Sequence, residues 1–81
     1  MELPHKMPDR IEDRKILGEF YDINKNRQWF HRVEFVEMHS SHLKPTLEIH
    51  CKYNPILEMK EILEFTSKYN LALEIISQSH R

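Results

Sequence analysis

Residues 46–77 constrain the fold more than any other stretch, because they read as strand, helix and strand with connections of only one or two residues. Thr46–Tyr53 alternates apolar with polar residues, which is the pattern of a strand buried on one face. Its expected inward side chains are Leu47, Ile49 and Cys51. Two strands joined through a helix run parallel by a right-handed crossover, so this stretch predicts a parallel pair covered by one helix.

Asn54 and Pro55 predict the start of that helix, because asparagine caps free amide groups of a first turn and proline has no amide to leave unpaired. An apolar stripe follows and ends near Asn70, where a left-handed residue is expected. The stripe consists of Ile56, Met59, Ile62, Leu63 and Tyr69. Residues 71–77 then predict the second strand, buried on one face. Its expected inward side chains are Leu71, Leu73 and Ile75.

The N-terminal half allows two interpretations. The apolar residues of Lys15–Ile23 are spaced as on a helix, whereas their aromatic content and the Asn-rich connection at 24–26 suit a strand entering a hairpin. Because residues 28–38 are rich in Trp, Phe and Val, we expect the hairpin, with a bulge near Phe35-Val36. The alternative is a helix over about residues 10–22.

The sequence therefore predicts an α+β fold in which one helix packs on a mixed four-stranded sheet, in the order β-β-β-α-β. If Lys15–Ile23 is helical, the order becomes α-β-β-α-β, close to a ferredoxin-like fold without its first strand. Either version leaves one face of the sheet poorly covered. The expected boundaries are an irregular leader at 1–14, one domain at 15–78 and a tail at 79–81. The thin core of an 81-residue chain favours a partner or self-association.

Composition argues against several function classes. Twelve Lys and Arg against 13 Asp and Glu give a net charge of −1, without the basic excess of most nucleic-acid binders. No apolar run approaches the roughly 18–20 residues of a membrane span. Cys51 is the single cysteine and residues 1–10 lack an apolar signal region, so we expect a cytoplasmic protein. A single glycine, Gly18, excludes a phosphate-binding glycine loop, and no catalytic motif is present, so we expect neither enzyme activity nor a cofactor.

The segment at 25–32 is the main candidate binding site, because it interleaves cations with aromatic rings. These residue types are enriched at protein-interaction hot spots. The expected partner-binding residues are Tyr21, Arg27, Trp29, Phe30 and Arg32. An apolar patch on the open sheet face is expected to extend this surface. The patch would consist of Phe30, Val36, Met38 and Ile76. The first hypothesis is therefore a non-enzymatic interaction module, either an adaptor, an inhibitor or a subunit, that binds a protein partner or itself.

Two alternatives use other chemistry. Cations beside aromatic rings also suit single-stranded nucleic acid, since the charges meet phosphates and the rings stack on bases. That site would consist of Lys25, Arg27, Trp29, Phe30 and Arg32. The less favoured alternative is metal-dependent regulation through His39, His42 and His50, since imidazole is a common ligand of zinc. Cys51 lies beside the last of these histidines but points to the opposite face of its strand, which weakens the metal hypothesis.

Overall fold

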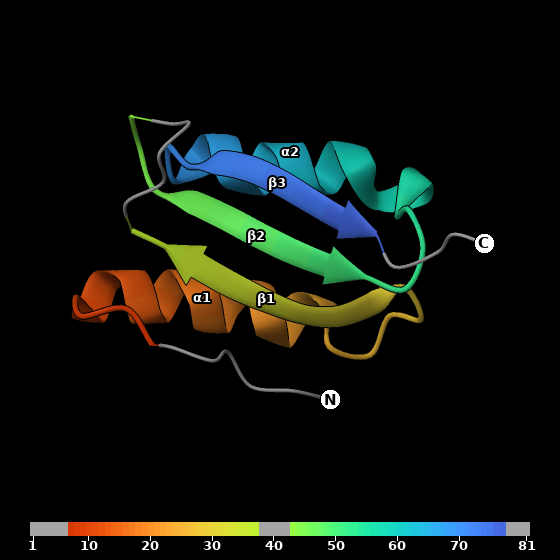
Figure 1. Cartoon of the computed structure of the whole chain (residues 1–81), viewed down its shortest axis with the longest axis horizontal. Helices are drawn as coiled ribbons and strands as arrows, with labels where there is room; N and C mark the ends of the chain where they lie inside the picture. Colours follow the sequence, from red (N-terminus) through yellow and green to blue (C-terminus); the bar gives the residue numbers. More distant parts are fainter. Residues whose placement is uncertain (1–6, 38–42, 78–81) are drawn as a thin grey trace.

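The computed structural model describes residues 7–37 and 43–77. The element order is α1 (Ile11–Asn24), β1 (Phe30–Val36), β2 (Thr46–Cys51), the short 3₁₀ turn η1 (Ile56–Glu58), α2 (Met59–Lys68) and β3 (Ala72–Ser77). The strands form one mixed sheet in the order β1-β2-β3, in which β1 is antiparallel and β3 parallel to β2. Both helices lie on the same side of this sheet (Figure 1).

The α+β class and the parallel pair agree with the prediction, but the described residues form a sheet of three strands and not four. Residues 15–23, predicted as a strand, belong to α1, so the order found is the alternative α-β-β-α-β. The helix begins at Ile11, within the expected leader. The tail expected at 79–81 and the first six residues of the leader lie outside the described residues.

The buried face of α1 explains why its helical pattern is weak. Four residues at helical spacing are buried, and two of them are polar. They are Asp13, Leu17, Phe20 and Asn24. Asn24 also ends the helix, because its Nδ2 donates to the carbonyl oxygen of Phe20 at 2.9 Å and its Oδ1 accepts from Nη1 of Arg27 at 2.9 Å. The Asn-rich connection is therefore a helix end and not the turn of a hairpin.

Strand β1 has a register irregularity between Phe30 and Arg32, whereas the bulge was expected near Phe35-Val36. An extra residue in one strand changes which side chains share a face. Phe30 and Val33 consequently both enter the core, where they are 4% and 0% exposed. The prediction that Phe30 lies on the open face of the sheet is therefore wrong.

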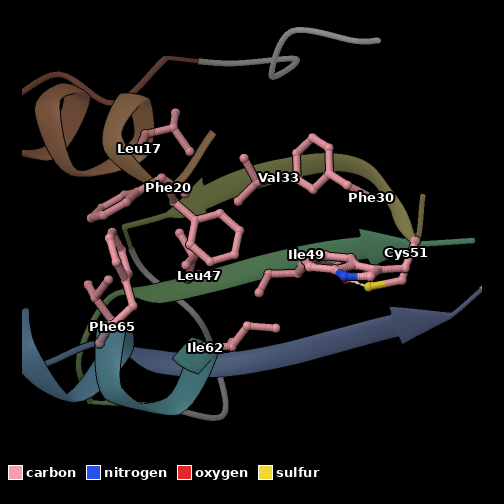
Figure 2. Packing of buried hydrophobic residues seen from close by; sticks show 12 residues of the cluster. Leu17, Phe20, Phe30, Val33, Leu47, Ile49, Cys51, Ile62 and Phe65 are labelled. Carbon is pink, nitrogen blue, oxygen red and sulfur yellow. Dashed lines mark hydrogen bonds between the residues drawn. The ribbon is translucent and has the colours of Figure 1, made fainter. Parts of the chain in front are cut away.

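The core lies between the sheet and the two helices (Figure 2). Phe20 of α1 and Phe65 of α2 meet edge to face with ring centroids 5.2 Å apart. Strand β2 contributes Leu47, Ile49 and Cys51, which are fully buried as predicted. Because β2 is the central strand, β1 and β3 flank its inward side chains on both sides. The aromatic pair joins the two helices over the sheet.

Helix α2 begins later than predicted, because the chain first makes the turn η1. A 3₁₀ turn has about 3.0 residues per turn, so it shifts the phase of the buried stripe relative to a continuous α-helix. Ile62 is buried as expected, and so is Phe65, which the predicted stripe omits. Ile56 and Leu63, which were assigned to that stripe, are 73% and 51% exposed. Asn70 has the expected left-handed backbone, with φ of 56°.

Candidate interaction surface

Exposed apolar side chains gather where the chain passes from β2 into α2. Tyr53, Ile56 and Leu57 are 46%, 73% and 92% exposed, and we call these three residues the turn patch. They border a hollow of about 450 Å³ that Arg27 and Trp29 also line. The hollow therefore joins the turn patch to the segment that follows α1.

The turn that presents the patch is anchored on both sides. Pro55 is fully buried, and its carbonyl oxygen accepts from the backbone N–H of Glu58 at 3.1 Å. The N–H of Ile56 donates to the carbonyl oxygen of Asn54 at 2.9 Å. The indole Nε1 of Trp29 donates to Oε1 of Glu58 at 3.1 Å. These bonds fix the turn while two large aliphatic side chains remain in solvent.

The aromatic residues predicted to bind a partner are mostly part of the core. Trp29 and Phe30 are only 3% and 4% exposed, and their rings meet edge to face at 5.9 Å. Tyr21 is half-buried and packs edge to face against Phe30, also at 5.9 Å. The partner-binding hypothesis required exposed aromatic rings, and of these three residues only Trp29 lines the hollow.

The predicted cations all lie close to carboxylates. Each pair joins two side chains within the described residues. The pairs are Lys25–Asp22 at 3.6 Å, Arg27–Glu61 at 3.2 Å and Arg32–Glu34 at 2.9 Å. Since the neighbouring rings are buried, the described part of the chain contains no platform of stackable rings and unpaired cations in this segment.

The open face of the sheet carries a central row of glutamates. Glu34, Glu48 and Glu74 lie side by side across the three strands. Arg32 and His50 occupy the next row, and each lies near a glutamate of its own strand, with His50 Nε2 at 2.8 Å from Glu48 Oε1. Three carboxylates against one arginine and one histidine give this face no excess of positive charge, which nucleic-acid binding favours.

Within residues 7–37 and 43–77, the members of the apolar patch predicted on this face do not lie together. Phe30 faces the helices, and Met38 lies outside the described residues. Val36 and Ile76 lie on the two outer strands and in different rows, with the glutamate row between them. The open face therefore does not extend the predicted binding surface.

The described residues include only one histidine of the metal hypothesis, His50. His39 and His42 lie outside the described residues, and His50 contacts Glu48. Burial raises the pKa of the Cys51 thiol to about 11, so this thiol is protonated at neutral pH and is a poor ligand or nucleophile. Within residues 7–37 and 43–77, no three His, Cys, Asp or Glu side chains are grouped to hold a metal ion.

Comparison of the chain with protein-family models, curated proteins and solved structures gives no match. In the part of the chain that the structure describes, neither helix has the length and apolar character needed to cross a membrane. A proposal of function therefore rests on the geometry of the described residues.

Sequence reasoning missed the turn patch because it treated Ile56 as the first residue of a buried stripe. One signal pointed the other way: Ile56 and Leu57 are adjacent, and adjacent residues on a helix lie about 100° apart. A narrow buried stripe cannot be centred on both side chains. Tyr53 carried no such signal, because it ends the alternating pattern of the preceding strand.

Proposed function

We propose that this chain is a non-enzymatic protein-interaction module that binds a protein partner through the turn patch. One observation carries the proposal: Ile56 and Leu57 are held in solvent, 73% and 92% exposed, on a turn that a buried proline and a hydrogen bond from the buried Trp29 tie to the core. Single exposed apolar residues are common on protein surfaces, whereas exposed apolar side chains grouped in one patch more often mark an interaction site.

The anchoring of the turn favours binding for an energetic reason. A flexible loop loses conformational entropy when it docks, whereas a turn that is already fixed loses less. Pro55 and the Trp29–Glu58 hydrogen bond supply that fixation here. The turn patch is therefore preorganised for binding.

The surroundings of the patch indicate the chemistry of the partner surface. Arg27 and Glu61 form an exposed ion pair near the hollow, and Lys52 and Lys60 are exposed on either side of the turn in sequence. An apolar centre with a polar rim is the usual anatomy of a protein interface. We expect a folded partner with an apolar cleft that accepts Leu57.

The proposed class of function is the one predicted from the sequence, but the proposed binding surface is the turn patch and not the 25–32 segment. Of the predicted residues, Arg27 and Trp29 line the hollow beside the turn patch, and Trp29 acts by holding Glu58. Phe30 and Arg32 contribute to the core and to the ion pairs of the open face. Nucleic acid is not favoured, because the rings of the 25–32 segment are buried and its cations face carboxylates.

The test compares tagged variants recovered gently from the source cells and weighed intact by native mass spectrometry. The patch variant carries Ile56→Ser and Leu57→Ser, and the control carries Leu63→Ser, an aliphatic residue on α2 that is 51% exposed. We expect a stoichiometric companion protein with the wild type and the control but not with the patch variant. A companion retained by the patch variant, or recovery of every form as bare protein or with oligonucleotide, would contradict the proposal.

A further inference from the structure

Strand β3 forms one edge of the sheet and carries few of the features that block edges. Natural edge strands are blunted by lysine, proline, bulges or covering segments, because their unpaired backbone groups attract other strands. Strand β3, with the sequence ALEIIS, has no lysine or proline, and its register with β2 runs without a bulge over Thr46–Cys51. Within the described residues, no strand lies on its outer side (Figure 1).

The opposite edge, formed by β1, has features that hinder pairing with another strand. Strand β1 has a register irregularity and places Arg32 and Glu34 on its open face. The segment before α1 is tied to its end, where the backbone N–H of Asp9 donates to Oε2 of Glu37 at 3.0 Å and Pro8 is fully buried. Only β3 therefore offers a straight edge in the described part of the sheet.

The register with β2 shows which backbone groups of β3 point outward. The N–H of Ala72 donates to the carbonyl oxygen of Pro45 at 2.8 Å, so the backbone N–H and C=O groups of Ala72 point toward β2. In a parallel pair, alternate residues direct their N–H and C=O groups to the neighbour. The backbone groups of Glu74 therefore also point toward β2, whereas those of Leu73 and Ile75 point to the outer side of the sheet.

We propose that two copies of this chain associate through β3, antiparallel about a two-fold axis at Ile75, so that two three-stranded sheets join into one continuous sheet. Ile75 then faces Ile75 of the second copy and exchanges both backbone hydrogen bonds with it. The half-buried side chain of Ile75 lies on the helix side of the sheet, next to the core. Pairing adds a second isoleucine beside this half-buried side chain.

Charge disfavours one of the neighbouring registers. A two-fold axis at Glu74 would also pair the outward backbone groups, but it would place Glu74 directly opposite its own copy. Like charges directly opposite each other in a sheet are destabilising. An axis at Ile75 places Glu74 opposite Ile76 of the second copy instead. Under this two-fold pairing, the outward backbone groups of Ile75 are satisfied equally in both copies, so a second copy is a complete partner for this edge.

The register gives a test in which one position carries opposite charges. Ile76→Glu places two glutamates opposite each other at two symmetric positions, whereas Ile76→Lys places lysine opposite Glu74. Both variants lose the same isoleucine, so the difference between their dimer dissociation constants isolates the charge. Cross-strand pairs of this kind predict a difference on the order of tenfold, with the Ile76→Lys dimer the tighter.

The measurement is sedimentation equilibrium on the purified chain over a dilution series, with circular dichroism to establish that each variant is folded. We expect a wild-type dimer that Leu57→Ser in the turn patch leaves unchanged, which separates this inference from the proposed function. A wild-type monomer at every concentration would overturn the inference. Equal dissociation constants for the two Ile76 variants would also overturn it, because the dimer would then use another surface or register.

Discussion

The aromatic contact between the two helices provides the strongest test of the fold. Phe20 is 1% exposed and meets Phe65 edge to face at 5.2 Å. Replacing a buried phenylalanine with alanine typically lowers the free energy of unfolding by about 3–5 kcal/mol, from lost burial and the remaining cavity. A chain of 81 residues has a total stability of about 4–12 kcal/mol. Phe20→Ala should therefore remove at least a quarter of the stability.

Urea unfolding followed by far-ultraviolet circular dichroism measures this loss. The matched control is Ile11→Ala, in the same helix but 65% exposed, which should change the free energy of unfolding by less than about 1 kcal/mol. If Phe20→Ala does not fold, Phe20→Leu gives a milder version of the same comparison. Equal losses for Phe20→Ala and Ile11→Ala would refute the packing of α1 on the sheet.

Gly18, Cys51 and Trp29 each allow the structure to be tested at a single residue. Gly18→Ala should raise the free energy of unfolding by roughly 0.5–1 kcal/mol in urea titrations, because the site is helical and an added Cβ meets nothing within 4 Å. The Cys51 pKa is raised from 9.0 to about 11, so the unfolded thiol ionises first as pH rises. Stability should fall by up to about 3 kcal/mol between these pH values, and Cys51→Ala should lack this step in unfolding measured against pH. Trp29 should emit at short wavelength and resist quenching by iodide, since it is 3% exposed; strong quenching of the folded chain would contradict its burial.

The parts of the fold that sequence predicts well are those in which a single physical pattern dominates. Leu47, Ile49 and Cys51 alternate cleanly because β2 is central and buried on one face. Asn70 follows a helix where the chain must reverse, and asparagine tolerates the left-handed backbone found there. The parallel pair follows from the short connections on either side of the helix.

Tertiary contacts that carry little sequence signal decide the other parts. Helix α1 buries Asp13 and Asn24, so its apolar stripe is too short to outweigh the aromatic residues that suggested a strand. The irregularity after Phe30 turns that ring into the core and removes it from the predicted site. The turn η1 likewise moves Ile56 from the expected core to the surface.

The proposed function is tested most directly by the affinity of the companion protein, once isolated, for three forms of the chain. Isothermal titration of the wild type, Leu57→Ser and Leu63→Ser measures the contribution of the turn patch against an equally aliphatic control. We expect Leu57→Ser to weaken binding by about thirtyfold or more, as for an interface hot spot, and Leu63→Ser to leave it within about twofold. Equal affinities for all three forms would show that the partner binds elsewhere and would contradict the role of the turn patch.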